Sequence, residues 1–384
     1  MGLVSSLLYQ FREMRRFQKL DRSERKFVFY AESESYWGYL YPFIHCLIKD
    51  YEQSVCYLTS SPSDPVLGGK LSGIRPFYIG TGSIRTILFA SLEADVLVMT
   101  LLDFGAYNLK RSKYPVHYVF VPHNMNSTHM VFRKGAHNAF DTIFCVGPHH
   151  LSELREAESI YSLAPRRLVE NGYVRLDALC EEVKRRGPPS PDSKRKVLIA
   201  PSWPPHSLLE MVGVDLIEVL LSAGYTVVVR PHRDTVSAHL DALRDRFGER
   251  QSFTLAEGEK GKDAFFDSDV VITDWSGSAF SFAFARERPV LFIDVPRKVL
   301  NLEYERFSSP PLEATIREKI GIVLKPDQIS RAPELVESLC GRGDEWAENI
   351  RAQRDRWVYN LGDSAQSGAA YLVELCVEGR MRQQ

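Results

Sequence analysis

The sequence predicts an α/β protein made of two doubly wound domains in tandem, which face each other across a cleft. The chain has 384 residues, more than one hydrophobic core normally supports. Short apolar segments of strand type alternate with helical segments in both halves, as is typical of parallel sheets covered on both faces. Between the halves, residues 184–196 read "KRRGPPSPDSKRK". Such prolines and charges cannot continue a buried element, so this stretch is the predicted linker.

The first half begins with a strand pattern at 26–33 ("KFVFYAES") and a helical pattern at 36–51 ("YWGYLYPFIHCLIKDY"). "DTIFCVGPHHLSELREAE" adds one more strand and a helix, and the strand patterns between them lie at 54–60, 75–80, 94–100 and 116–123. We therefore expect a Rossmann-like domain over residues 26–188.

The same alternation resumes after the linker. "KVLIAPSW" (196–203), "YTVVVRPH" (225–232) and "SDVVITDW" (268–275) have strand patterns, and residues 208–224 have a helical pattern. A second Rossmann-like domain is predicted over residues 195–345.

Composition narrows the function classes. The net charge of -1 argues against a nucleic-acid partner. Because no apolar run is long enough to span a membrane and no signal peptide is visible, we expect a place in the cytoplasm or on the cytoplasmic face of a membrane. Six cysteines without a CxxC pair favour free, mostly buried thiols in a reducing compartment: Cys46, Cys56, Cys145, Cys180, Cys340 and Cys376.

The N-terminal residues 1–25 predict an amphipathic helix. Apolar side chains recur there at helical spacing, with basic side chains among them: Leu3, Val4, Leu7, Leu8, Phe11, Met14 and Phe17, then Arg12, Arg15, Arg16 and Lys19. Such a helix could rest on an anionic membrane surface, or it could pack on its own domain. The sequence leaves both interpretations open.

Ligands of open α/β sheets bind beyond the carboxyl ends of the strands. This rule turns the strand map into a map of candidate site residues. Polar or chemically capable residues follow four of the predicted strands: His123, Ser202–Trp203, Arg230 with His232, and Asp274–Ser278.

The turn after the strand at 268–273 predicts an anion site. Ser276, Gly277 and Ser278 stand at the start of a helical stretch. Backbone N–H groups and hydroxyls at a helix N-terminus bind phosphate well, and a glycine permits close approach. N-capping by Asp274 or Ser276 is the simpler alternative. N-capping explains the presence of one such residue at the start of a helix, but it explains the presence of three less well.

The motif "VVVRPH" places Arg230 and His232 after another strand, with Pro231 fixing the backbone between them. A guanidinium suits bidentate phosphate contact. An imidazolium could neutralise a diphosphate or protonate a leaving phosphate, although a lone histidine here is more often structural.

His123, in "VFVPHNMNSTHM", lies where the first predicted sheet should open onto the cleft. An imidazole that titrates near neutrality is the usual general base for a hydroxyl nucleophile. Other histidines compete for this role: His129, His137, His149 and His150.

Several common catalytic motifs do not occur. The chain has no GxxxxGK[ST], HExxH or GxSxG motif, no GxGxxG after the first strand, and no metal-ligand spacing. The residues thus indicate no cofactor, and they leave metal dependence open.

From about residue 26 to residue 375 the chain resembles the CDP-glycerol glycerophosphotransferase family, the teichoic-acid and capsule enzymes with a GT-B fold. The resemblance is carried by an ordered set of short motifs: "PHN" (His123), "NGYVRLD" (Gly172, Arg175, Asp177), "APSW" (Ser202, Trp203), "RPH" (Arg230, His232), and "SDVVITDWSGSAF" followed by "RPVLF".

The resemblance implies transfer of glycerol phosphate, or a related polyol phosphate, from a CDP-activated donor to an acceptor hydroxyl of a polysaccharide or lipid-linked glycan, with release of CMP. It implies that His123 is the base and that His232 lies at the donor diphosphate. Because an imidazolium there could protonate the leaving phosphate, His232 is the second catalytic candidate. It places Ser202, Trp203, Arg230 and the 274–278 turn around the donor. It also implies that helices over 346–384 return toward the first domain.

The motifs depart from the family pattern in three places. The family commonly has His-Gly where this chain has His123-Asn124, and Asp-Tyr-Ser-Ser where this chain has Asp274-Trp275-Ser276-Gly277. Near the C-terminus, "NLGDSAQSGA" replaces the usual Asp-Gly and downstream Arg. These departures bear on donor and acceptor identity rather than on the fold.

Two other functions stay open. A GT-B glycosyltransferase that uses a CMP- or UDP-sugar would need the same base and the same diphosphate site. A non-catalytic nucleotide- or glycan-binding module would not need His123 together with Arg230 and His232.

Overall fold

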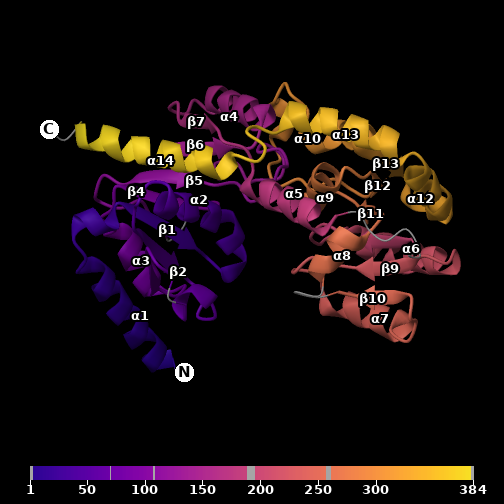
Figure 1. Cartoon of the computed structure of the whole chain (residues 1–384), viewed down its shortest axis with the longest axis horizontal. Coiled ribbons are helices and arrows are strands. Elements are labelled where there is room, and N and C mark those ends of the chain that lie inside the picture. Colours follow the sequence, from indigo (N-terminus) through magenta and orange to yellow (C-terminus); the bar gives the residue numbers. More distant parts are fainter. Residues whose placement is uncertain (1–2, 70, 107–108, 188–194, 257–260, 382–384) are drawn as a thin grey trace. The chain divides into compact units, whose positions relative to one another are not determined.

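The computed structural model describes residues 3–69, 71–106, 109–187, 195–256 and 261–381. Two compact units make up the chain (Figure 1). Unit 1 comprises Met1–Asn124, Phe132–Arg175 and Val358–Gln384, and unit 2 comprises Met125–Val131 and Leu176–Trp357. Each unit is built on its own sheet.

In the described residues of unit 1, seven parallel strands form the sheet in the order β3-β2-β1-β4-β5-β6-β7. The strands are β1 (Phe27–Ala31), β2 (Val55–Thr59), β3 (Ile74–Tyr78), β4 (Val96–Met99), β5 (His117–Phe120), β6 (Thr142–Cys145) and β7 (Arg167–Glu170). The helices are α1 (Leu3–Gln18), α2 (Trp37–Lys49), α3 (Ser83–Ala90), α4 (Pro148–Ile160) and α14 (Ser364–Met381), with 3-10 turns η1 (Arg22–Arg25), η2 (Glu34–Tyr36) and η3 (Pro65–Leu67).

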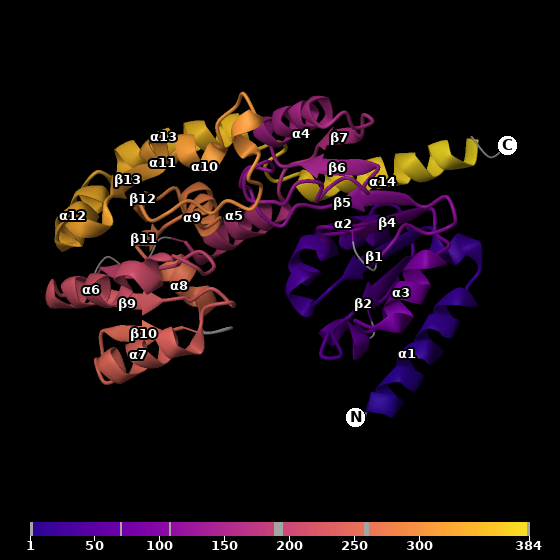
Figure 2. The same ribbon diagram turned by 180° about the vertical axis from the view of Figure 1, so that it is seen from behind.

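Both faces of this sheet are covered, which explains why strands such as β1 and β4 are apolar along their whole length. Successive side chains of a strand point to opposite faces. In β1, Val28 and Tyr30 join the core beneath α1 and α3, whereas Phe27 and Phe29 join the core beneath α2 and α14. Figures 1 and 2 show α14 alongside α2, although it closes the chain.

In the described residues of unit 2, six parallel strands have the order β10-β9-β8-β11-β12-β13. They are β8 (Lys196–Ile199), β9 (Thr226–Val229), β10 (Phe253–Leu255), β11 (Val270–Thr273), β12 (Val290–Ile293) and β13 (Gly321–Leu324). The helices are α6 (Leu208–Ser222), α7 (Ser237–Phe247), α8 (Gly261–Asp267), α9 (Ser278–Arg286), α10 (Leu312–Thr315), α11 (Arg317–Ile320), α12 (Ala332–Gly341) and α13 (Gly343–Trp357), with 3-10 turns η5 (Tyr304–Arg306) and η6 (Pro326–Arg331).

Two parallel-sheet α/β domains were predicted, and the structure confirms them. That they face each other across a cleft stays a prediction. Part of the predicted linker, 188–194, lies outside the described residues.

The units divide the chain at points that the sequence pattern did not mark. Helix α5 (Val174–Arg186) contains the boundary between Arg175 and Leu176, ahead of the linker. Among the C-terminal helices, α13 belongs to unit 2 and α14 to unit 1. Two arginines of α13, Arg351 and Arg354, pair with Glu287 at the end of α9, which explains its place in unit 2.

The N-terminal helix α1 divides its apolar side chains between the core and the surface. Met14 and Phe17 are buried, and the Phe17 ring packs edge-on against Phe77 of β3. On the outer side, Leu7, Leu8 and Phe11 are 51%, 65% and 48% exposed. The helix therefore packs on its own domain and also presents an apolar strip. Within the described residues, no helix is long and apolar enough to cross a membrane.

The cysteines are free, as predicted. Four are buried, and burial raises the pKa of Cys56 and of Cys145 to about 12. At neutral pH these two thiols are therefore protonated and unreactive.

Candidate active site

The carboxyl ends of three neighbouring strands bring the predicted donor residues of unit 2 together. Strands β9, β8 and β11 are adjacent and parallel, so their carboxyl ends lie at one edge of the sheet. Ser202, Arg230 and Asp274 follow these strands within three residues. Contacts among the three loops confirm that they meet.

The Asp274 side chain points inward and holds the loop after β8 by hydrogen bonds. It is 1% exposed, and its two carboxylate oxygens accept the backbone N–H groups of Ser202 (2.7 Å) and Leu208 (2.8 Å). Burial raises the pKa of Asp274, and these two hydrogen bonds oppose that rise. The carboxylate thereby fixes the loop after β8 and the start of α6 beside the 274–278 turn. A direct contact of Asp274 with a diphosphate stays a prediction.

The 274–278 turn and Arg230 form a compact set of anion-binding groups. Arg230 donates from a guanidinium nitrogen to Ser278 Oγ at 3.0 Å, and Ser276 Oγ accepts the Ser278 N–H at 3.2 Å. Ser278 is the first residue of α9, and Gly277 precedes it with φ of −60°. Gly277 thus adopts an ordinary backbone conformation, so its contribution is the absence of a side chain. Two hydroxyls, a guanidinium and a helix N-terminus meet at this point.

His232 lies in the loop after β9 with one ring nitrogen occupied. Its Nδ1 accepts the Asp234 N–H at 3.2 Å. Burial lowers the pKa of His232, with the Asp234 carboxylate acting in the opposite direction. The neutral ring therefore carries its proton on Nε2, which can donate to an oxygen of a ligand. The Trp203 ring is centred 6.4 Å from His232.

Lys298 adds a cation to this region that the sequence patterns did not single out. Its ammonium group lies over the Trp203 ring, 5.9 Å from the ring centre, and also donates to the Pro205 carbonyl. Burial lowers the pKa of Lys298, while Asp274 acts to raise it. Lys298 comes shortly after the "RPVLF" motif and β12. Its position behind this motif is the sequence feature that could have pointed to it.

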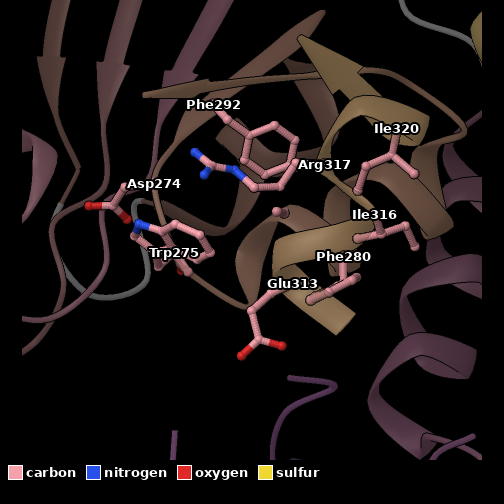
Figure 3. A pocket seen from close by; sticks show the side chains of 10 residues that line it. Asp274, Trp275, Phe280, Phe292, Glu313, Ile316, Arg317 and Ile320 are labelled. Atoms are coloured by element: carbon pink, nitrogen blue, oxygen red, sulfur yellow. The ribbon is translucent and has the colours of Figure 1, made fainter. Parts of the chain in front are cut away.

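A small apolar pocket, with room for little more than one water molecule, borders the 274–278 turn (Figure 3). Trp275, Phe280 and Phe292 line it with rings, and the Arg317 guanidinium stacks over Trp275 at 4.3 Å from the ring centre. The carboxylate of Glu313, which also lines the cavity, points away from it in Figure 3. This packing fixes Trp275 and hence the turn on either side of it.

In unit 1, His123 follows β5 and is surrounded by aromatic rings. Tyr36, Tyr39 and Phe132 have ring centres 5.8, 6.5 and 6.0 Å from the His123 ring, all at steep angles. The Tyr173 hydroxyl donates to the His123 carbonyl at 2.9 Å. These rings hold the imidazole in place; its Nδ1 is buried, while His123 as a whole residue is half-buried.

The tyrosines come from the carboxyl ends of other strands, and the sequence patterns did not single them out. Tyr36 and Tyr39 follow β1, and Tyr173 follows β7 through Gly172. Gly172 has φ of +91°, and a Cβ there would lie 2.3 Å from the Tyr359 carbonyl. The "NGY" motif therefore needs its glycine for both conformation and space. The aromatic-rich stretch "YWGYLY" after the first strand is the sequence feature that could have pointed to these tyrosines.

The competing histidines are buried. His137 packs between the rings of Phe120 and Phe132, and burial first of all lowers its pKa to about 3. His149 and His150 are buried on α4, and His129 is buried in unit 2. Of the five histidines weighed, His123 alone is half-buried rather than buried.

A search for a metal site among the residues that the structure describes finds no cluster of three or more histidine, cysteine, aspartate or glutamate side chains. The groups at the 274–278 turn and at Arg230 are hydroxyls, N–H groups and a guanidinium, which are chemically suited to hydrogen-bond a phosphate.

Residues 123–298 match the protein-family model described as CDP-Glycerol:Poly(glycerophosphate) glycerophosphotransferase. The matched segment begins at His123 and includes Arg230, His232 and the 274–278 turn. This match confirms, over that segment, the resemblance seen in the sequence motifs. A search of curated protein sequences finds no significant match.

Solved structures with the same fold cover nearly the whole chain. The wall teichoic acid polymerase TagF matches 97% of this chain and 95% of its own, with 15% identity and a TM-score of 0.61. The UDP-GlcNAc 2-epimerase from Neisseria meningitidis bound to UDP-GlcNAc matches 91% and 100%, with 15% identity and a TM-score of 0.61. The S. aureus MnaA-UDP co-structure matches 91% and 97%, with 14% identity and a TM-score of 0.58. These matches confirm the predicted GT-B-like fold class.

Proposed function

We propose that this chain, whose residues 123–298 match the glycerophosphotransferase family model, transfers glycerol phosphate or a related polyol phosphate from a CDP-activated donor to an acceptor hydroxyl. The acceptor is a polysaccharide or lipid-linked glycan of the cell surface, and CMP is the second product. The observation that carries the proposal is the extent of the match, which includes both the candidate base and the whole anion-binding set.

The chemistry is an in-line displacement at phosphorus. His123 takes the proton of the acceptor hydroxyl, whose oxygen forms a bond to the polyol-phosphate phosphorus. The bridging P–O bond breaks, and its electron pair leaves with CMP. Positioning and charge neutralisation supply most of the acceleration of such a reaction.

The residues of unit 2 suit the diphosphate of the bound donor and the phosphate of the departing CMP. Arg230, the Ser276 and Ser278 hydroxyls and the N-terminus of α9 neutralise the negative charge. His232 donates from Nε2 as a neutral ring, because Nδ1 already accepts a backbone N–H. Trp203 lies beside His232, and the Lys298 ammonium group lies over the Trp203 ring. These two side chains complete the donor side.

The exposed strip of α1 supports work at a membrane surface. Leu7, Leu8 and Phe11 are exposed beside the exposed basic side chains of Arg12 and Arg15. An apolar strip flanked by cations suits an anionic lipid surface. We therefore infer a peripheral enzyme on the cytoplasmic face of the membrane, where a lipid-linked acceptor is accessible.

The test is nucleotide release from a panel of donors: CDP-glycerol, CDP-ribitol, a CMP-sugar and a UDP-sugar. We expect release of CMP from a CDP-polyol. His123→Ala should abolish transfer and leave the affinity for CMP nearly unchanged, since the imidazole touches the acceptor hydroxyl. His45→Ala is the matched control, because His45 is an exposed histidine of the same unit.

Release only from the UDP-sugar or the CMP-sugar would replace the proposal with the glycosyltransferase alternative. Binding of CMP without turnover of any donor would favour the non-catalytic module. Full activity of His123→Ala would remove His123 from the role of base.

A further inference from the structure

The loop that carries His123 runs directly into unit 2. Strand β5 ends at Phe120, and Asn124 is the last residue of that stretch to belong to unit 1. Met125–Val131, here named the strap segment, belongs to unit 2, and the chain returns to unit 1 at Phe132. The residues that follow His123 are therefore held by side chains from the other half of the sequence.

Glu313 of α10 holds the strap segment near its start. Its two carboxylate oxygens accept the backbone N–H of Ser127 at 2.9 Å and the Ser127 hydroxyl at 2.8 Å. Ser127 is 0% exposed and Glu313 is 4% exposed. Hydrogen bonds to a buried carboxylate are among the stronger ones, and their geometry is tightly defined.

The end of the strap segment is anchored separately. Asn301 donates from its side chain to the His129 carbonyl at 2.9 Å, and the N–H of Leu300 donates to the Met130 carbonyl at 2.9 Å. The His129 ring stacks on Phe307 at 4.6 Å between ring centres. With these contacts in place, loss of the Glu313 contact would loosen the start of the segment while the end stays attached.

Glu313 also belongs to the surroundings of the donor site. It lines the cavity behind the 274–278 turn together with Trp275 and Ser276, while its carboxylate points away from that cavity (Figure 3). One side chain thus borders the anion-binding turn and binds the segment that begins two residues after His123.

We propose that Glu313 is a positioning residue, which acts through Ser127 to fix the loop that carries His123. This inference rests on the proposed function, in which His123 is the base. A displacement of a catalytic group by about 1 Å costs on the order of 100-fold in rate. Glu313 should therefore act on turnover and leave donor binding largely unchanged.

The test compares Glu313→Gln and Ser127→Ala with matched controls from unit 1. Asp64 is a buried carboxylate that also accepts one backbone N–H, from Val66 at 3.1 Å, and one hydroxyl, from Tyr57 at 2.9 Å. Asp64→Asn and Tyr57→Phe remove equivalent hydrogen bonds away from the strap segment. They measure what a comparable loss of stability does to the rate.

We expect kcat to fall about ten- to 100-fold in Glu313→Gln and less in Ser127→Ala, which keeps the backbone hydrogen bond. The Kd for CMP should stay within about twofold, and the two controls should keep kcat within about twofold. A second readout needs no substrate. In histidine-labelled protein, the ring resonance of His123, assigned through its loss in His123→Gln, should shift in both strap variants and in neither control.

Two results would overturn the positioning role. One is a folded Glu313→Gln protein with unchanged kcat and an unchanged His123 resonance. The other is an equal loss of kcat in Asp64→Asn. If the wild type transfers nothing from any donor in the panel, the proposed function fails, and the resonance comparison still decides whether Glu313 positions His123.

Discussion

At the scale of single residues, burial decides what each histidine can do. His137 is enclosed by aromatic rings and stays neutral, with a pKa lowered to about 3. His232 is partly buried, and its Asp234 contact assigns the proton of the neutral ring to Nε2. His123 follows a strand end and is half-buried as a residue, with its Nδ1 enclosed. Only the last two suit roles that involve a ligand.

The buried His137 predicts how stability depends on pH. Its pKa is about 3 in the folded protein, against an ordinary value of about 6.5 when unfolded. Between these values the unfolded chain binds more protons, so the free energy of unfolding should fall as pH is lowered, by up to about 1.4 kcal/mol per pH unit from this residue.

Urea unfolding between pH 4.5 and 7 measures this dependence. His137→Phe should flatten it, since the ring no longer titrates, while His45→Ala should keep it. The comparison uses the slope with pH, which does not depend on the packing change. An unchanged slope in His137→Phe would show that other groups dominate the pH dependence.

Arg230 predicts the strength of donor binding. Removing a charged hydrogen bond to a phosphate costs about 1.5–3 kcal/mol, so Arg230→Ala should weaken binding of CDP-glycerol roughly ten- to 100-fold. Ser278→Ala should act in the same direction, because Ser278 bonds to Arg230 and begins α9.

Calorimetric titration measures both affinities. Arg250→Ala is the matched control, because Arg250 is an arginine of the same unit that pairs with Glu218 on the surface. Wild-type affinity in Arg230→Ala would show that the diphosphate binds elsewhere.

At the scale of elements, α1 packs on its own domain and also presents the apolar strip that we propose contacts a membrane. Its inner side supplies Met14 and Phe17 to the core of unit 1, and Arg16 stacks over Phe77 at 4.0 Å. Its outer side is apolar around Leu8 and Phe11. Deleting the helix would thus remove core side chains as well as the surface strip.

Point substitutions separate the packing role of α1 from the proposed membrane contact. Leu8→Glu and Phe11→Glu together should abolish sedimentation with anionic phospholipid vesicles and leave the unfolding temperature nearly unchanged, since both side chains are exposed. Phe17→Ala should lower stability by about 3–5 kcal/mol through the cavity it leaves. Vesicle binding by the Leu8→Glu, Phe11→Glu protein equal to that of the wild type would exclude α1 as the membrane contact.

At the scale of the whole molecule, each sheet presents its candidate site residues beyond strand ends, and the two units hold different kinds of candidate group. The anion-binding groups belong to unit 2, and the candidate base belongs to unit 1. The chain crosses between units within the His123 loop, within α5, and between α13 and α14. A ligand that binds to one unit should therefore change hydrogen exchange mainly in that unit.

Hydrogen exchange with CMP tests this division. CMP at about 100 times its Kd stabilises its binding unit by about 2.7 kcal/mol. We expect added protection at 202–208, 230–234 and 274–280, and little change at 34–39. Inorganic phosphate at the same concentration is the control for the nucleotide. Protection confined to unit 1 would contradict the donor assignment.

The sequence by itself determined the class of fold and located most of the residues proposed for the donor site. Strand periodicity is local, and ligand groups of a parallel sheet follow strand ends, so Ser202, Arg230 and Ser276 could be found by position alone. The residues next to them in the sequence are enough to identify them.

Only the tertiary structure decided which distant residues complete those sites. The hydrogen bonds between Ser127 and Glu313 join residues 186 positions apart, and the rings around His123 come from the ends of β1 and β7 as well as β5. Local periodicity does not encode strand order, and strand order sets which loops meet. For the same reason Asp274 could be located from the sequence, while its two backbone hydrogen bonds, and hence its fastening role, could not.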